Sequence, residues 1–332
     1  MLTSLKSLFE KFFNLIDGAV FIVTKLYIKK IFLAGKNIGE GLATAQRLTD
    51  KGYGVTYHIM TENLTDELMV QANLQTNIAL VLRADARGLQ GNLAVKLSAF
   101  GGALSNSKSS EECGATPYLN EEKAKYYLGL LLSRINHIPE IEVEIDAEEY
   151  HTLWGAHRVI EELSKTFPGR LRMAVQMHVP DFDKLSTQQG YAQRKIRIVR
   201  GAGVYEDVAS KNVVSDIVTN ERAFDLAWQC IEAGHTPYVG TLTNMPLFER
   251  ILENLDGSNL RYDAIVLESL YGAIGRKLRR YALRKGVRVV VYTPIVVKWC
   301  LDAWEPYCRR RVPMMRKYFW KLFIVGIKKI FS

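Results

Sequence analysis

The chain has 332 residues, of which 48% are hydrophobic and 24% charged, which is the composition of a globular protein and argues against a disordered chain. A formal net charge of +9 favours anionic ligands or an anionic membrane surface, whereas no helix-turn-helix, zinc-finger or aromatic RNA-binding pattern supports nucleic acid as a partner. The six histidines contain no H-x-x-x-H pair, so the sequence predicts no metal site.

Residues 1–50 are predicted to form helices that pack on the rest of the protein. Their apolar residues are interrupted by Lys6, Glu10, Lys11 and Asp17, so no run reaches the roughly 18 uncharged apolar residues that suggest a membrane span. A signal-peptide cleavage pattern is absent as well. The four cysteines are scattered and include no C-x-x-C pair, which is typical of reduced thiols and predicts a cytoplasmic location.

From residue 51 to residue 332, strand-like and helix-like segments alternate. Short apolar runs, many rich in β-branched residues, are followed by segments of helical periodicity. Eight such units predict an α/β fold with a closed (β/α)₈ TIM-like barrel, and an open doubly wound sheet is the alternative. The predicted strands are 54–60, 93–100, 141–147, 172–179, 195–201, 236–242, 263–270 and 287–293, and Pro294 is expected to end the last one.

Beyond the last predicted strand, an apolar helical pattern runs from about residue 297 to Tyr307 and then meets Arg309, Arg310 and Arg311. Three consecutive arginines spread over nearly a full helical turn, so at least one leans toward the core side. They form either a solvated basic turn or a C-terminal arginine pair that holds a small carboxylate over the barrel mouth.

The tail of residues 316–332 alternates aromatic and basic residues. Such a segment either packs back on the protein or lies on a membrane surface. In the second case the protein would be peripheral at the inner face of the membrane.

Polar and charged residues gather where the predicted strands end, which is where a barrel of this kind carries its chemistry. Singly, most have a structural explanation: Lys96 can extend along apolar surface to solvent, and Asp146 can cap the next helix. Arg197 is harder to explain, because a buried guanidinium among isoleucines and valines needs an anionic or polar partner. Together they predict a cationic, hydrogen-bonding pocket, made of Lys96, Asp146, Gln176, Arg197, Arg200, Thr241, Glu268 and Tyr292.

These residues and their neighbours occur in an order that resembles the proline dehydrogenase family. The similarity runs from about Ile31 to Arg311, which is nearly the whole predicted barrel. In chain order, the matching segments are Val95 to Ala99, Asp146 to Glu148, Gln176, Arg197 to Ala202, Leu270 to Gly272, Tyr292 to Pro294, Pro306-Tyr307 and Arg310-Arg311.

The resemblance implies a barrel that binds FAD non-covalently and oxidises L-proline to Δ1-pyrroline-5-carboxylate by hydride transfer to flavin N5. It implies that Lys96, Arg197 and Asp146 are catalytic and that a quinone or another acceptor takes the electrons. The implied substrate contacts are Lys96, Arg310 and Arg311 for the carboxylate, with Asp146, Leu270, Tyr292 and Tyr307 around the ring. The implied cofactor contacts are Gln176 and Arg197 at the isoalloxazine, with Val199, Arg200, Gly201, Ala202, Thr241, Leu242 and Thr243 along the cofactor.

Two of the implied cofactor segments depart from the family pattern. The family's Lys-Gly-Ala-Tyr stands here as Arg200-Gly201-Ala202-Gly203, and its Thr-His-Asn stands as Thr241-Leu242-Thr243. Three alternatives therefore stay open. The chain is a proline dehydrogenase of specialised metabolism, such as a carbapenem antibiotic pathway, a flavin-free barrel that binds proline without catalysis, or an unrelated barrel enzyme acting on a phosphorylated substrate.

Overall fold

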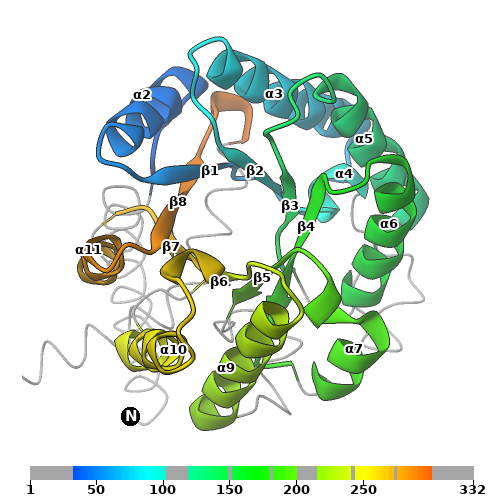
Figure 1. The fold of residues 1–332 in the computed structure, drawn as a ribbon. Helices are drawn as coiled ribbons and strands as arrows, with labels where there is room; N and C mark the ends of the chain where they lie inside the picture. The colour runs from blue at the N-terminus through cyan, green and yellow to red at the C-terminus, as the bar shows by residue number, and fades with distance from the viewer. Residues whose placement is uncertain are drawn as a thin grey trace, which may run out of the picture.

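The computed structural model describes residues 33–101, 119–148, 152–179, 182–199, 215–240, 244–272 and 275–300. Eight parallel strands form a closed barrel in sequence order, and β8 pairs with β1 to complete the ring (Figure 1). The predicted TIM-like barrel is thus confirmed. The strands are β1 Gly54–Ile59, β2 Asn92–Val95, β3 Val143–Ile145, β4 Leu171–Gln176, β5 Ile196–Val199, β6 Tyr238–Gly240, β7 Val266–Leu270 and β8 Arg288–Ile295.

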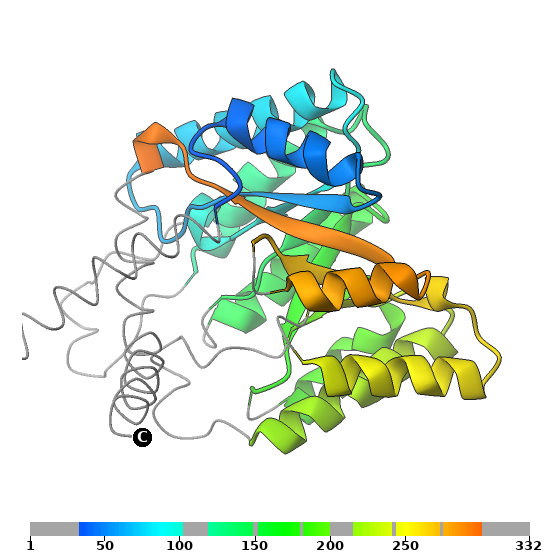
Figure 2. The same cartoon turned by 90° about the vertical axis from the view of Figure 1, so that its left-hand side faces the viewer.

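Helices surround the barrel and connect its strands, as the two perpendicular views in Figures 1 and 2 show. The α-helices are α2 Ile38–Thr49, α3 Glu67–Asp85, α4 Ser98–Gly101, α5 Glu121–Arg134, α6 Leu153–Thr166, α7 Phe182–Gln189, α9 Asp216–Glu232, α10 Met245–Gly257 and α11 Arg276–Arg284. Short 3₁₀ turns occur at η2 Tyr191–Gln193, η3 Tyr262–Ala264 and η4 Lys298–Cys300.

Side-chain caps fix where several helices begin. An Asn, Asp or Ser before the first helical residue accepts a hydrogen bond from a backbone N–H of the first turn, which has no partner inside the helix. This makes the start of each helix a local property of the sequence. The capping residues are Asn37 of α2, Asp66 of α3, Asn120 of α5, Ser215 of α9 and Asn244 of α10.

Alternation along the strands separates an apolar outer layer from an unusual interior. In β1, Val55, Tyr57 and Ile59 are at most 2% exposed and belong to the hydrophobic core that includes the helices. Thr56 lies on the opposite face, and its hydroxyl donates across the barrel to the carboxylate of Glu268 in β7. Branched apolar residues usually fill the interior of such a barrel, whereas here the interior carries ionic groups.

The second predicted strand differs most in kind from what the structure shows. Residues 93–100 were expected to be a single strand, but β2 ends at Val95 and helix α4 begins at Ser98. The turn between them is fixed by backbone hydrogen bonds from Ala99 to the Lys96 carbonyl at 3.1 Å and from Phe100 to the Leu97 carbonyl at 2.9 Å. An apolar run alone does not distinguish a strand from a short buried helical turn.

Strand β8 continues through Pro294 to Ile295, so the prediction that Pro294 ends it was wrong. The amide groups of Tyr292 face β7, because the N–H of Tyr271 donates to the Tyr292 carbonyl at 2.8 Å. Two residues later the proline nitrogen faces the same side. Strand β7 has already ended there, at Leu270, which pairs with Tyr292. The missing N–H therefore removes no hydrogen bond to β7, and the Pro294 carbonyl still accepts one from the N–H of Ala34 at 2.8 Å.

The predicted N-terminal segment, residues 1–50, is described only from residue 33, and the predicted C-terminal arginine helix and tail lie outside the described residues. Helix α2 packs closely on β8, because a Cβ at Gly41 would come within 2.3 Å of the Ile295 side chain. In the part of the chain that the structure describes, every helix is too short or too polar to cross a membrane.

Candidate active site at the barrel mouth

Five of the predicted site residues come together at the C-terminal end of the barrel. Asp146 and Lys96 follow β3 and β2 directly, Gln176 ends β4, and Arg197 and Tyr292 lie in β5 and β8. Leu270 and Val199 end β7 and β5 and are partly exposed. Glu268, also predicted, lies inside β7. The remaining predicted residues lie outside the described ranges, and these are Arg200, Gly201, Ala202, Thr241, Leu242, Thr243, Tyr307, Arg310 and Arg311.

Asp146 links two of these residues. One carboxylate oxygen is ion-paired with Nη2 of Arg197, and the other accepts a hydrogen bond from the Tyr292 hydroxyl at 3.1 Å. Burial alone would raise the pKa of the Asp146 carboxyl, but Arg197, Lys96 and His58 outweigh it and hold that pKa below its usual range. Asp146 therefore stays ionised at neutral pH and keeps the hydroxyl of Tyr292 directed toward it.

Lys96 and Gln176 engage acidic or carbonyl oxygens on either side of Asp146. The ammonium of Lys96, which is 7% exposed, lies 2.6 Å from Oε2 of Glu62. The Gln176 amide donates to the backbone carbonyl of Glu148 at 3.1 Å. Glu148 in turn accepts hydrogen bonds from the backbone and hydroxyl of Ser98. The mouth is thus a charge-paired polar surface, whereas the sequence predicted a cationic, hydrogen-bonding pocket.

Several residues of the mouth were not singled out from the sequence. His58 of β1 lies against Tyr292 with ring centroids 5.3 Å apart, and its Nδ1 is 3.0 Å from the Ala94 carbonyl. Burial lowers the pKa of His58 to about 4, against the opposing effect of Asp146, so its imidazole is neutral near pH 7. Glu62 was missed as well. His58 lies in β1 and Glu62 follows it, and the sequence has no Asp, Glu, Lys or Arg between the start of this strand and Glu62 that would have drawn attention to its end.

One layer deeper, Arg197 contacts two more carboxylates, of which Glu268 belongs to the pocket predicted from the sequence and Glu144 was not assigned to it. Its Nη1 lies 3.0 Å from Oε1 of Glu144 and 3.2 Å from Oε2 of Glu268. A usable signal was present, because Glu142, Glu144 and Asp146 alternate with apolar residues and must share one face of β3. In a closed barrel that face is the interior.

Two local features support this arrangement, a glycine that leaves room beside Arg197 and an arginine that holds the turn after β7. Gly240 of β6 has no side chain, and a Cβ there would lie 3.0 Å from Val199 and 3.4 Å from Arg197 Cγ. The turn after β7 is held by Arg279, whose guanidinium donates to the carbonyls of Leu270 at 2.5 Å and Gly272 at 2.6 Å. The backbone that carries Leu270 is therefore fixed from the helix side.

The mouth provides groups that suit the ring of a flavin. The Nε–H of Arg197 is buried and has no hydrogen-bond partner in the described residues, although a buried donor normally has one. A ring acceptor such as flavin N5 would satisfy it. Beside it, a pocket between β3, β4 and α6 is lined by Ile145, Asp146, Ala147, Glu148, Thr152, Leu153, Ala156, Met173, Ala174, Gln176 and Val179.

The acidic side chains of the mouth pair with cations rather than gather into a cluster of their own. The described side chains contain no group of three or more His, Cys, Asp and Glu that could hold a metal ion. The paired carboxylates of the mouth are instead neutralised by Lys96 and Arg197. Such a site can orient a small zwitterion and stabilise developing charge through fixed dipoles and ions.

No protein-family model matches the sequence, and no curated protein sequence matches it either. The fold is similar to that of proline utilization A (PutA) from Bdellovibrio bacteriovorus inactivated by N-propargylglycine, with a TM-score of 0.69 and 18% identity over 85% of this chain and 32% of that one. The enzyme from Corynebacterium freiburgense gives a TM-score of 0.67 and 18% identity over 87% of this chain and 31% of that one.

A third structure, of PutA with proline bound in remote sites, gives a TM-score of 0.65 and 16% identity over 86% of this chain and 30% of that one. This chain thus spans about a third of the length of these proteins. At such identity the similarity establishes a shared barrel fold. The resemblance predicted from the sequence is confirmed at that level.

Proposed function

We propose that this barrel is an FAD-dependent L-proline dehydrogenase that forms Δ1-pyrroline-5-carboxylate. The observation that carries the proposal is the meeting of Lys96, Asp146, Gln176, Arg197 and Tyr292 at the mouth of a barrel that has the PutA fold. These are the residues that the sequence resemblance assigns to substrate and flavin. Two of the similar structures, PutA inactivated by N-propargylglycine and PutA with proline bound in remote sites, are consistent with this substrate class.

In this proposal the bound flavin would accept a hydride from the carbon next to the proline nitrogen. Gln176 and the Nε–H of Arg197, which has no hydrogen-bond partner in the described residues, would hold the isoalloxazine ring, and Val199 would lie along the cofactor. Asp146 fixes the guanidinium of Arg197 from one side and the hydroxyl of Tyr292 from the other. The protein's contribution is orientation, which is the main source of acceleration when two bound groups must meet.

Lys96 is proposed to bind the substrate carboxylate, together with Arg310 and Arg311. Its ammonium is paired with Glu62 at 2.6 Å, so a substrate carboxylate must displace Glu62 or share the ammonium with it. The electrons would pass to a quinone or another acceptor. The described site contains no feature that favours an antibiotic pathway over proline catabolism.

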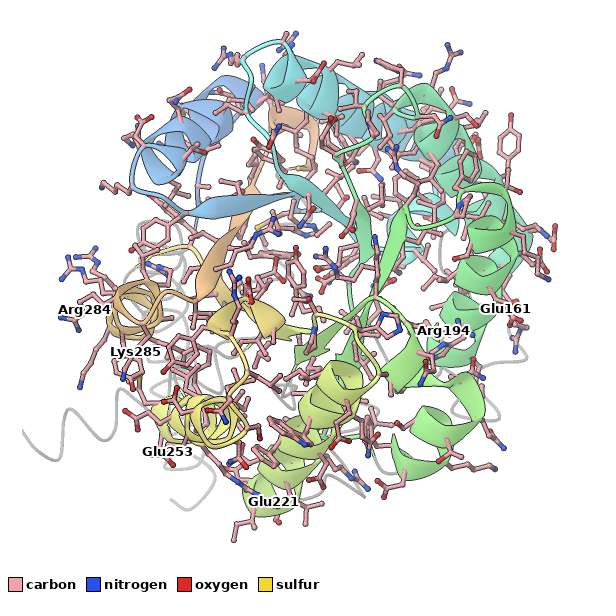
Figure 3. All side chains as sticks on the ribbon, viewed as in Figure 1. Glu161, Arg194, Glu221, Glu253, Arg284 and Lys285 are labelled. Carbon is pink, nitrogen blue, oxygen red and sulfur yellow. The ribbon has the colours of Figure 1, made fainter. Side chains whose placement is uncertain are left out.

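The experiment is reconstitution of the purified protein with FAD, followed by anaerobic addition of L-proline while the visible flavin absorbance is recorded. We expect a flavin spectrum that L-proline bleaches. Arg197→Lys should slow the bleaching, because an ammonium keeps the charge among the carboxylates but lacks the Nε–H and the fork. Arg284→Lys is the matched control, since Arg284 is exposed and projects from the outer side of α11 (Figure 3).

The alternatives give different results in the same experiment. A protein that stays colourless with excess FAD but binds L-proline in calorimetry would be a flavin-free, non-catalytic barrel. The departures from the family pattern at Arg200 and Thr241 are the reason for this alternative. A yellow protein that L-proline leaves oxidised, while dithionite reduces it, would remove proline as the substrate.

A further inference from the structure

The interior of the barrel contains a column of ionic side chains from neighbouring strands. From the N-terminal end toward the mouth they are Glu142, Arg172, Glu144, Arg197 and Asp146, and Glu268 of β7 joins at the level of Arg197. Glu144, Arg172, Arg197 and Glu268 are all at most 6% exposed. Charges buried this deeply are expensive unless each is neutralised.

Negative charge exceeds positive charge in this column. Two guanidinium groups face four carboxylates, and Lys195 offsets only Glu142, at the half-exposed outer end, where the two are 2.6 Å apart. Around Arg197 the imbalance is sharpest, because a single Nη1 lies 3.0 Å from Glu144 and 3.2 Å from Glu268. Both carboxylate oxygens are ion-paired with this one nitrogen, so the two groups would repel each other if both were fully ionised.

The hydrogen bonding of the two carboxylates is unequal. Glu268 accepts from the Thr56 hydroxyl of β1 and from Nη1 of Arg197. Oε1 of Glu144 is buried and makes no hydrogen bond to the described residues, although it is close to Arg197. Its other oxygen lies 3.5 Å from Nη1 of Arg172. A proton on this oxygen of Glu144 would therefore break no hydrogen bond to the described residues, and it would weaken only the ion pair with Arg197.

We propose that Glu144 and Glu268 form a buried carboxyl pair that holds one proton at neutral pH and positions Arg197 at the base of the mouth. The proton would be lost in the alkaline range, which would place an additional negative charge beside the guanidinium. The role in catalysis rests on the proposed function, whereas the proton itself does not. Glu144 and Glu268 would thus be positioning residues that act through Arg197.

The groups around the pair raise or lower the pKa of Glu144, or are neutral themselves. Burial raises the pKa of Glu144 to about 8, and Glu268 and Asp146 add to this, whereas Arg197 and Arg172 oppose it. Tyr292 of β8 is neutral, because burial and Asp146 hold its pKa well above its usual value. On β6, the ring of Tyr238 lies 3.3 Å from the guanidinium of Arg172. His58 of β1, also neutral, lies nearer the mouth.

The proton can be tested on the protein as purified, with or without flavin. In infrared difference spectra recorded between pH 6 and pH 10, a protonated carboxyl group gives a carbonyl band that disappears when the group ionises. We expect such a band to titrate near pH 8 in the wild type and to be missing in Glu144→Gln. Glu253→Gln is the matched control, since Glu253 is exposed on α10 (Figure 3) and should leave the band unchanged.

Glu268→Gln provides a second variant if Glu144→Gln folds poorly. Removing one negative charge beside Glu144 should shift the titration of the band to lower pH. A wild type with no carbonyl band that titrates in this range would overturn the proposal. So would a band that survives unchanged in both Glu144→Gln and Glu268→Gln.

The positioning role has its own readout, the flavin midpoint potential as a function of pH. Ionisation of the pair would place negative charge near a bound flavin and make it harder to reduce. We expect an additional fall in the wild-type potential near pH 8 that Glu144→Gln lacks, and identical curves would refute the positioning role. If no flavin binds, the proposed function fails, and the infrared titration still decides whether the pair holds a proton.

Discussion

Arg197→Met should destabilise the fold strongly, and the loss should grow with pH. The side chain is 6% exposed, and its two terminal nitrogens face Glu144, Asp146 and Glu268. Replacing the guanidinium by an apolar chain leaves these carboxylates without their shared cation. Removing one partner of a buried ion pair costs about 3–5 kcal/mol, because the remaining charge is buried and uncompensated.

The sign of the pH dependence follows from linkage. Without Arg197, the carboxylates have raised pKa values in the folded state and ordinary values in the unfolded state. The folded protein then binds more protons, so its stability is highest below the unfolded pKa and falls as pH rises. The loss caused by Arg197→Met should therefore be smaller at pH 5 than at pH 8, because stability falls with each step in pH between the ordinary pKa of the unfolded carboxyls and their raised pKa in the folded variant.

The assay is urea unfolding of both proteins, monitored by circular dichroism at pH 5 and pH 8. Arg284→Met on the outer side of α11 is the control and should change stability by less than about 0.5 kcal/mol at either pH. A partial rescue is expected when Glu268→Gln is added to Arg197→Met, because one uncompensated charge is removed. A loss that matches the Arg284 control, or one that is equal at both pH values, would refute the ion-pair account.

Three further predictions can be checked separately. Glu144→Gln should match the wild type near pH 5 but exceed its stability near pH 9 by on the order of 3 kcal/mol. The reason is that the pKa of Glu144 is raised from 4.5 to about 8 in the folded state, so the wild type loses stability as pH rises through that window. Urea unfolding at the two pH values measures this, and no difference at pH 9 would contradict it. Arg310→Met or Arg311→Met should weaken the binding of L-proline by roughly 1.5–3 kcal/mol, or more than about tenfold. Arg309→Met should change the binding little, and Arg→Lys at 310 or 311 should recover part of the loss. Proline-dependent flavin reduction ranks the variants, and a largest loss at Arg309 would show that the predicted helix register is wrong. Truncation after Tyr318 should abolish sedimentation with anionic liposomes, and equal pelleting of both forms would exclude a role for the tail.

The barrel could be predicted because its signal is local. The β-branched run that ends in Tyr292 and the period-two pattern around Glu144 each specify a strand from a few residues. Alternation of strands with helices then restricts the topology to very few folds. Capping residues such as Asn37 and Asp66 also act within four residues.

The errors in the fold come from effects beyond the single strand. Whether Pro294 ends β8 depends on where β7 stops, because the ladder loses a hydrogen bond only if a neighbour is present to accept it. Likewise, the apolar run after Lys96 turns into α4, which packs against α5. Neither neighbour can be read from the segment itself.

Five of the predicted site residues meet in the structure, but the pairing between them was not predicted. Arg197 was recognised as a buried guanidinium that needs an anion, but its partners come from other strands. One of them, Glu268, also accepts a hydrogen bond from Thr56, which is 212 positions away in the sequence. Period-two patterns give the face that a carboxylate occupies. Only closure of the ring brings the faces of β3, β5 and β7 together. The sequence therefore gives the face of each carboxylate, but not the meeting of Glu144 and Glu268 at one nitrogen of Arg197.

The most direct test of the central claim is a single anaerobic turnover of the FAD-reconstituted protein with L-proline, in which reduced flavin and product are both quantified. The account predicts that Δ1-pyrroline-5-carboxylate forms in an amount equal to the flavin that is reduced, and that Arg197→Lys slows both together. Full retention of oxidised flavin in the presence of excess L-proline, in a protein whose flavin dithionite still reduces, would contradict it.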